Sequence, residues 1–269
     1  MTIRRTGFWR AAALLAVPLG ITASGARADA PAGPDPIATE RPGFNNGTET
    51  VLPGTLQLEL GYSYSYSGSG ATHVSQIGNG AQLRIPITAR SEVRFGLPSY
   101  QWAYTSGTPT QSGLTDSTVS AKLRFLDGIA AKRPSLAVIA GTTLPTGADA
   151  FREDHTQPFA ALEATEELSG LWTLQASTTY ADARNGGVRF DQFGAGVGVN
   201  YAVTSNVATF LEAYRISPTG VGAPNGDYID GGVTLAAGKN AQYDAAAGKG
   251  IATGANPDFY LSVGYSLRF

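Results

Sequence analysis

The sequence contains no cysteine and only two histidines, His73 and His155. Without cysteine the chain forms no disulfide, offers no thiol nucleophile and builds no cysteine-ligated zinc site. Two histidines leave little for a histidine-based metal site, so we predict no metal and no cofactor. We expect both histidines in loops, and no Gly-x-Ser-x-Gly motif supplies an esterase serine. The sequence therefore indicates a protein that is not an enzyme.

Charged residues and long apolar runs are both scarce. Charged side chains make up 15% of the 269 residues, below the roughly 25% of soluble globular domains, yet the mean hydropathy is only −0.07. The net charge of −2 excludes the basic footprint of a protein that binds nucleic acid. Beyond Ile21 no apolar run reaches the roughly 20 residues of a spanning helix. If the mature chain enters a membrane, it does so as strands.

The first residues have the pattern of an export signal. Arg4, Arg5 and Arg10 precede an apolar stretch, Ala11–Ile21, and residues 26–28 form an Ala-x-Ala cleavage site. The apolar stretch is about half the length that spans a bilayer, which disfavours the alternative of a membrane anchor. We predict that residues 1–28 (Met1–Ala28) are a cleaved signal peptide.

Proline and glycine dominate the next segment, Asp29–Gly54, which has no periodicity. From Thr55, apolar and polar side chains alternate at every second residue, as in a strand with two unlike faces. The first strand is about twice the usual roughly 5 to 6 residues and suits a tilted strand that crosses a bilayer. After Pro98 the alternation slips by one residue, which predicts a bulge. The pattern predicts twelve strands: Thr55–Tyr66, Gln76–Ile87, Glu92–Tyr104, Asp116–Phe125, Ser135–Leu144, Gln157–Glu166, Trp172–Ala181, Arg189–Tyr201, Val207–Ile216, Tyr228–Ala236, Ala241–Gly250 and Phe259–Phe269.

These strands predict an all-β fold, a transmembrane antiparallel β-barrel over Thr55–Phe269. A soluble β-sandwich shows the same alternation, with the apolar side chains in its core. The strand length, the glycine, serine and charge on the polar face, and the aromatic residues at strand ends favour the membrane. Short and long connections alternate, with Thr105–Gly113 among the long ones, and this layout places both termini on the short-turn, periplasmic side. The expected aromatic bands are Phe95, Phe125, Trp172, Tyr201, Tyr265 and Phe269 near the periplasm, and Tyr64, Tyr66, Tyr180 and Phe259 near the outer surface.

Several motifs resemble a known family. Thr39–Phe44, Val51–Gly54 and Leu56–Tyr62 match the T-D/E-R-P, V-x-P-G and L-Q-x-E-x-G-Y motifs that open the mature chains of the outer-membrane transporter family labelled for the MetA pathway of phenol degradation. The resemblance covers nearly the whole mature chain. It implies a channel in the outer membrane of a Gram-negative bacterium that passes small solutes, including hydrophobic or aromatic ones. The ending Tyr265, Leu267 and Phe269 also resembles the signal by which barrels reach their assembly machinery.

The polar strand faces supply the residues expected to line the lumen. With seven acidic and five basic candidates, one interpretation is pairing across the lumen that holds the wall together. The other is a basic ladder of Arg84, Arg94, Lys122 and Arg124 that orients a polar solute. Inward aromatic residues either contact an aromatic solute or narrow the lumen by packing. The ionisable candidates are Glu59, Arg84, Glu92, Arg94, Asp116, Lys122, Arg124, Glu163, Glu212, Asp230, Asp244 and Arg268, and the aromatic ones are Phe210, Tyr214, Tyr228 and Tyr260.

Twelve strands predict a narrow bore, between a filled eight-stranded barrel and a porin. The irregular segment 29–54 is then a candidate plug, because such backbone at membrane depth needs protein around it. Its candidate contacts are Glu40, Arg41 and Phe44. A disordered periplasmic tail is the alternative.

The loop Pro145–Thr156 carries Asp149, Glu153, Asp154 and His155, but its carboxylates lack EF-hand spacing, and we expect a solvated outer loop. We predict a channel whose partners are outer-membrane lipids, a small-molecule solute and, during biogenesis, the barrel-assembly machinery, with no nucleic acid. A closed barrel with a structural or surface-interaction role is the alternative from another class. A lipolytic outer-membrane enzyme is a third, weaker one.

Overall fold

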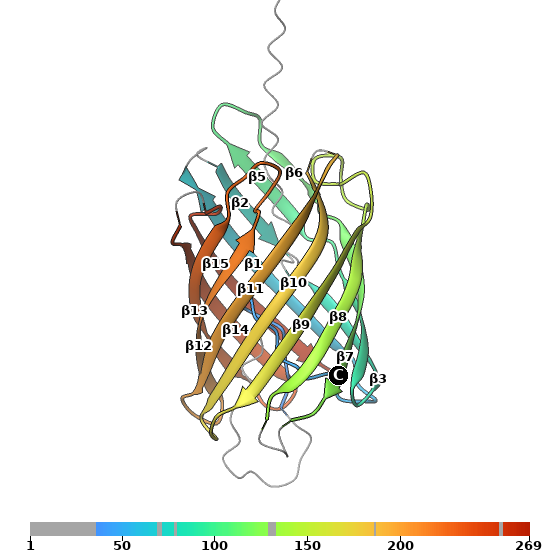
Figure 1. The fold of residues 1–269 in the computed structure, drawn as a ribbon, viewed down its shortest axis with the longest axis vertical. Helices are drawn as coiled ribbons and strands as arrows, with labels where there is room; N and C mark the ends of the chain where they lie inside the picture. The colour runs from blue at the N-terminus through green and yellow to red at the C-terminus, as the bar shows by residue number, and fades with distance from the viewer. Residues whose placement is uncertain (1–35, 69–71, 78–79, 129–132, 186, 253–254) are drawn as a thin grey trace, which may run out of the picture.

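The computed structural model describes residues 36–68, 72–77, 80–128, 133–185, 187–252 and 255–269. Fifteen strand segments form one antiparallel sheet, which closes where β15 (Phe259–Arg268) pairs with β1 (Gln57–Ser67). Figure 1 shows the resulting barrel with its tilted strands. Closure satisfies the backbone hydrogen bonds of both edges, which lipid cannot do. Among the described residues, no helix is long and apolar enough to cross a membrane.

The fifteen segments make twelve barrel strands, because three strands are each built from two segments. The interrupted strands are β2 with β3 (Thr72–Ile77 and Gln82–Thr88), β4 with β5 (Ser91–Gly96 and Tyr100–Thr105), and β6 with β7 (Gln111–Leu114 and Ser117–Leu126). The uninterrupted strands between these and β15 are β8 (Ser135–Leu144), β9 (Gln157–Glu167), β10 (Trp172–Asn185), β11 (Val188–Ala202), β12 (Val207–Ser217), β13 (Gly226–Ala236) and β14 (Ala241–Gly250).

The predicted twelve-stranded closed barrel is confirmed, with three corrections at its edges. The irregularity expected after Pro98 is a full break between β4 and β5, since proline has no N–H to continue the ladder. The second strand begins at Thr72, so His73 lies in β2 and not in a loop. The expected loop Thr105–Gly113 contains the start of β6. The last two differences arise because β2, β5 and β6 pair with one another beyond the regular alternation of the sequence.

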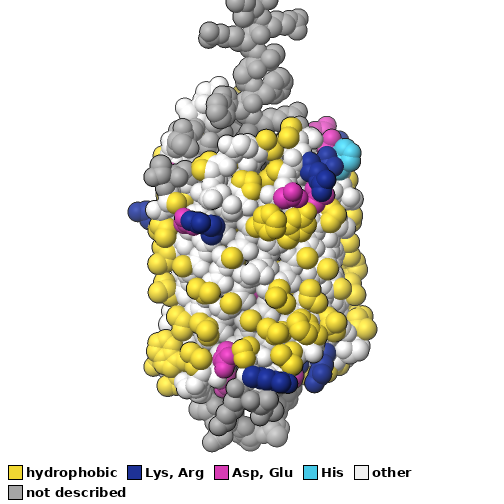
Figure 2. Space-filling model, viewed as in Figure 1, with side chains coloured by type: hydrophobic (Ala, Val, Ile, Leu, Met, Phe, Trp, Pro, Cys, Tyr) yellow, Lys and Arg dark blue, Asp and Glu magenta, His cyan; other side chains and the backbone are white. Residues whose placement is uncertain are grey.

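The two faces of the wall differ as expected for a membrane barrel. On β1, Gln57 and Glu59 are 1% exposed, whereas Leu60 and Tyr62 are 39% and 41% exposed. Figure 2 shows hydrophobic side chains over the outer surface and charged ones near its two rims. A soluble barrel has the opposite arrangement, with its apolar residues inside.

The short and long connections lie at opposite ends of the barrel. The turns 89–90, 168–171, 203–206 and 237–240 share one end with the C-terminus, where Arg268 N donates to Asn240 O at 2.7 Å. Trp172 and Tyr201 pack together at this end, with ring centroids 4.6 Å apart. At the other end, Phe259 lies 5.6 Å from Tyr66. The outward aromatic pairs therefore lie toward the two rims, and the bore runs between them.

Candidate functional site

The irregular leader, residues 36–54, lies inside the barrel, as the blue trace in Figure 1 shows. It starts beside the β13–β14 turn, where Ile37 N donates to Lys239 O at 2.9 Å. It ends just before β1, where Val51 N donates to Glu92 Oε2 at 2.8 Å. Between these points Asn45 and Asn46 are both 0% exposed. The leader thus crosses the bore and is enclosed by the wall.

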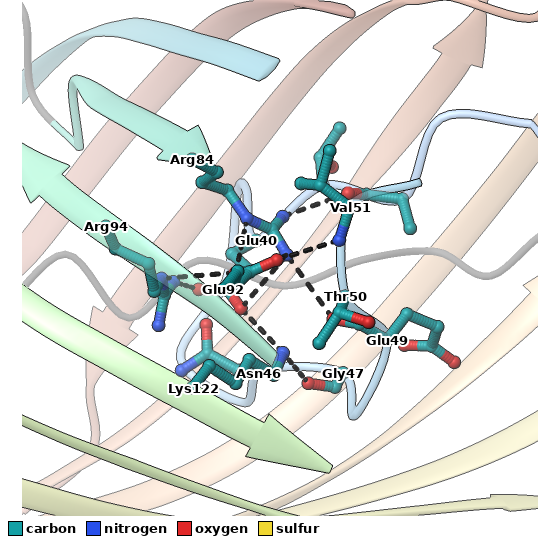
Figure 3. Close-up of polar contacts among 12 residues, drawn as sticks. Glu40, Asn46, Gly47, Glu49, Thr50, Val51, Arg84, Glu92, Arg94 and Lys122 are labelled. Atoms are coloured by element: carbon teal, nitrogen blue, oxygen red, sulfur yellow. Dashed lines mark hydrogen bonds and ion pairs between the residues drawn. The ribbon is translucent and has the colours of Figure 1, made fainter. Parts of the chain in front are cut away.

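Three cations and three carboxylates form a buried charge cluster on one side of the bore (Figure 3). Arg84 is at its centre, with Nε 2.8 Å from Glu92 Oε1 and Nη1 2.9 Å from Glu59 Oε1. The third carboxylate, Glu40, comes from the leader. The members are Arg84, Arg94 and Lys122 with Glu40, Glu59 and Glu92.

Strand register explains why the wall needs the leader's carboxylate. Arg84 on β3 and Arg94 on β4 are directly opposed, an arrangement that destabilises a sheet when the charges are alike. Glu40 contacts the Arg94 guanidinium and lies 2.7 Å from Lys122 Nζ. With Glu40 the cluster is electrically balanced, and without it one positive charge would be left buried. The wall charges therefore pair between neighbouring strands on one side of the bore, and the leader supplies the remaining carboxylate.

The same cations also hold the leader's backbone. Arg84 Nη1 donates to Ala38 O at 3.0 Å and Lys122 Nζ donates to Gly47 O at 2.5 Å. Hydrogen bonds from charged donors are stronger than neutral ones. The leader is therefore attached to the same side of the barrel at two points, Ala38 and Gly47.

Arg41 attaches the leader to β14 and β15, on the other side of the β1–β15 pairing from the charge cluster. Its Nη2 lies 2.9 Å from Ser262 Oγ and 3.4 Å from Asp244 Oδ1. Gly61 and Gly264, which are register partners on β1 and β15, leave the space for the guanidinium. A Cβ atom at either glycine would lie 2.3 Å from an Arg41 side-chain atom. A side chain at either position would therefore have to displace the Arg41 guanidinium.

The middle of the leader binds two more wall carboxylates. Glu212 on β12 accepts hydrogen bonds from Phe44 N and from Asn45 N, the latter at 3.1 Å. Glu163 on β9 accepts one from Asn46 Nδ2 at 3.1 Å and another from the Ser177 hydroxyl. The leader therefore donates hydrogen bonds to both of these buried wall carboxylates.

Phe44 belongs to an aromatic stack that rises along the wall. Its ring lies 4.4 Å from that of Tyr214, at an interplanar angle of 1°, and Tyr214 stacks on Tyr228 at 4.9 Å. The hydroxyls of Tyr214 and Tyr260 are 2.9 Å apart, and Tyr260 donates to Asp230. Phe210, also inward, is buried next to Ala246. The structure thus brings Tyr214, Tyr228 and Tyr260 together beside the leader ring of Phe44.

Three predicted lumen residues lie apart from these contacts. Asp116 occupies the break between β6 and β7 and accepts from Gly147 N at 2.8 Å, so it secures the long loop. Arg124 reaches the short-turn rim, where Nη2 lies 3.3 Å from Ala89 O. Arg268 Nη2 binds Asn240 Oδ1 at 3.0 Å in the β13–β14 turn. Of the four residues in the predicted basic ladder, Arg84, Arg94 and Lys122 lie in the charge cluster, and Arg124 lies nearer the rim.

The long loop 145–156 is exposed near its carboxylates. His155 Nδ1 lies 2.7 Å from Asp154 Oδ1, and this hydrogen bond lowers the pKa of the Asp154 carboxyl below its usual range. Within the part of the chain that the structure describes, no three His, Cys, Asp or Glu residues are grouped to hold a metal ion.

Sequence reasoning missed the amides and glycines that seat the leader. Asn45 and Asn46 carry no charge or periodicity, and their role depends on where the irregular backbone runs. The glycine pair Gly61 and Gly264 lay on the face already predicted to be inward. Small residues on an inward face next to a candidate plug were the one available signal.

A residue larger than glycine at position 61 is expected to loosen the leader. Because the chain has no cysteine, Asn46→Cys provides a single, buried thiol whose maleimide labelling reports leader release. Adding Gly61→Val should raise the labelling rate on the order of tenfold, as for a segment that opens locally. Gly170→Val is the matched control, since a Cβ there meets nothing within 4 Å. Equal rates for both variants would contradict this role of Gly61.

The comparisons with known proteins agree with this architecture. The structure is similar to the COG4313 outer membrane channel from Pseudomonas putida F1, with a TM-score of 0.61, 17% identity, and coverage of 82% of this chain and 98% of that one. It is also similar to the KdgM porin, with a TM-score of 0.52, 8% identity and coverage of 79% and 99%, and to the NanC porin, with 0.50, 11%, 79% and 98%. At these identities the likeness establishes the barrel fold. No curated protein matches in sequence.

A family model described as "Putative MetA-pathway of phenol degradation" matches residues 39–269. The match begins at Thr39, so it includes most of the leader as well as every barrel strand. The chain belongs to this family.

Proposed function

We propose that the protein is an outer-membrane channel for small solutes, and not an enzyme. One observation carries the proposal: the closed barrel turns its polar face inward around a bore and its apolar face outward. Only a barrel in lipid gains from an apolar exterior, and a polar interior suits the passage of solutes through water. The solved structures with this fold include an outer membrane channel and porins.

The leader is proposed to close the bore at rest. It is attached by the charge cluster, by Arg41 and by Glu212, which lie on different parts of the wall. Separate attachments favour a segment that blocks the bore over a disordered tail that enters it transiently. The proposal includes a cleaved signal peptide over residues 1–28, which lie outside the described residues. It also includes termini on the periplasmic side, which the short turns beside the C-terminus support.

Hydrophobic or aromatic compounds are the proposed solute class. The family's description refers to phenol degradation, and the inward stack of Tyr214 and Tyr228 offers aromatic contacts along the wall. The lipids of the outer membrane and the barrel-assembly machinery are proposed partners. The outward-facing side chains contact the lipids, and Tyr265, Leu267 and Phe269 form the C-terminal signal.

A structural barrel without transport is the second candidate. The leader crosses the bore between the charge cluster and Glu163, as a permanently closed barrel would require. Liposome swelling with solutes of graded size distinguishes the two functions. We expect the wild type to admit small solutes slowly and a leader deletion to admit them faster. No swelling with either protein would support the structural role.

A lipolytic activity has a separate test. Hydrolysis of phospholipid by the purified protein, with and without His155→Ala, checks His155, whose Nδ1 lies beside the Asp154 carboxylate. We expect no hydrolysis that depends on His155. A loss of measurable hydrolysis in the variant would instead indicate an enzyme.

A further inference from the structure

We propose that the Phe44 seat is a binding site for a neutral aromatic solute that carries a hydrogen-bond donor, and that such a solute displaces Phe44 and frees the leader. This inference rests on the proposed channel function and names the ligand class and the opening mechanism of its lumen. The Phe44 seat is the space between the inward face of β11 at Gly194 and Gly196 and the ring face of Tyr214 on β12.

The Phe44 seat has the shape of one aromatic ring. Phe44 lies parallel to Tyr214 at 4.4 Å, the separation of a stacked pair. On its other side, a Cβ atom at Gly196 would lie 2.7 Å from Phe44 Cδ1, and one at Gly194 would lie 3.1 Å from Phe44 Cζ. Two glycines at alternate positions of β11 therefore keep open a slot that any larger residue would fill.

The ring that occupies the seat does not belong to the barrel wall. Phe44 belongs to the irregular leader, which contributes no ladder hydrogen bonds at this point, whereas Gly196 and Tyr214 are paired in the wall. If the leader withdraws, the seat remains in the wall with one ring face exposed. A planar solute of similar size can then take the same stacking contact.

A carboxylate beside the Phe44 seat determines the chemistry of the solute. Glu212 accepts hydrogen bonds from Phe44 N, from Asn45 N at 3.1 Å and from Asn45 Nδ2. These donors leave with the leader, and an unmatched buried acceptor is costly. A hydroxyl or amino group on the solute ring would replace one of them. An aromatic carboxylate would be repelled, because Glu212 and Asp230 are opposed across β12 and β13.

The aromatic stack gives the solute a route to the Phe44 seat. Tyr214 continues to Tyr228, whose hydroxyl donates to Asn256 O at 2.7 Å in the long connection after β14. The stack therefore extends from the seat toward the long-loop end of the barrel. A ring entering from that end meets one aromatic face and then the next.

Phenol, cyclohexanol and benzoate are the probes that test the inference on the full-length protein. Cyclohexanol has the hydroxyl but no planar ring, and benzoate has the ring but a negative charge. With the single thiol of Asn46→Cys, we expect phenol to raise the maleimide labelling rate by roughly fivefold, the contribution of one aromatic pair. Neither of the other two solutes should do so. Equal effects of phenol and cyclohexanol would overturn the proposal.

Direct binding separates the seat from general loosening of the leader. Phe44→Leu keeps apolar bulk but removes the internal ring that competes for Tyr214, so phenol should bind roughly fivefold more tightly by equilibrium dialysis. Adding Gly196→Val should abolish this gain by filling the slot. Folding of the variant is checked by its heat-modifiable migration in SDS gels, as for other barrels. Unchanged phenol affinity in a folded Phe44→Leu variant would also overturn the proposal.

Ion conductance distinguishes this failure from failure of the channel itself. If a leader deletion conducts ions but phenol binds no variant, the binding site at the Phe44 seat is contradicted and the channel function is still supported. If no variant conducts or admits solutes, the proposed function fails whether or not phenol binds.

Discussion

Deletion of residues 36–46 is expected to raise the single-channel conductance in planar bilayers on the order of tenfold, toward that of an open twelve-stranded bore. The deletion removes Glu40, Arg41 and Phe44, and with them the contacts to the charge cluster, to Asp244 and to Tyr214. The barrel strands begin only at Gln57, so the ladder between β1 and β15 stays complete. What changes is the material inside the bore.

The same deletion is expected to change ion selectivity. The deletion removes the cation Arg41 as well as Glu40, so the inward wall keeps three cations against more carboxylates. The cations are Arg84, Arg94 and Lys122, and the carboxylates are Glu59, Glu92, Glu163, Glu212, Asp230 and Asp244. An acidic wall in a narrow bore favours counter-ions, so the reversal potential in a salt gradient should shift toward cations. Adding Glu212→Gln to the deletion removes one of these carboxylates and should reduce this shift while conductance stays high. This pair separates the charge effect from the loss of the obstruction.

An unchanged conductance after the deletion would contradict the role of the leader as the plug. Glu40→Gln in the full-length chain is the intermediate case, because it removes one charge and keeps the backbone. We expect frequent brief openings in this variant and not a constant open state, since Arg41 and Glu212 still hold the leader. Recordings under one voltage protocol should give the lowest open probability for the wild type, an intermediate one for Glu40→Gln and the highest for the deletion.

The alternation of the sequence was sufficient to predict the wall. Because side chains of a strand alternate between faces, Glu59 and Leu60 had to lie on opposite sides, and the structure places them so. Closure followed from the absence of water in lipid. The breaks at β2–β3 and β6–β7 were not predictable, because they depend on how neighbouring strands pair beyond their alternating part.

The partners within the bore were beyond sequence reasoning. Lys122 and Arg124 share a face, yet one is in the charge cluster and the other at the rim, since strand tilt and side-chain length decide their reach. The position of Glu40 depends on the path of a segment without periodicity. Its charge showed that it could pair, but only the three-dimensional path brings it between Arg94 and Lys122.

Replacing the central cation of the cluster is expected to have the largest effect on stability. Arg84→Met removes the partner that lies 2.8 Å from Glu92 and 2.9 Å from Glu59, and it leaves buried carboxylates with fewer cations. Breaking a buried ion pair on one side costs about 3–5 kcal/mol of unfolding free energy. Urea unfolding in detergent micelles, followed by tryptophan fluorescence, measures the loss. Trp102 and Trp172 both face outward, so they report loss of the barrel wall.

The matched control for Arg84→Met is Arg215→Met, which breaks an ion pair of similar length on the barrel surface. Arg215 Nε lies 2.5 Å from Asp227 Oδ1, but the two side chains are 57% and 27% exposed, so solvent screens the pair and we expect a much smaller loss of unfolding free energy. A second comparison places Arg84→Met in the leader deletion, where Glu40 is gone and the remaining charges balance without Arg84. The cost should then fall well below that in the full-length chain, and the difference measures the coupling between wall and leader. Equal costs in both backgrounds would mean that the wall charges are satisfied by one another and that the leader is held by its other contacts alone.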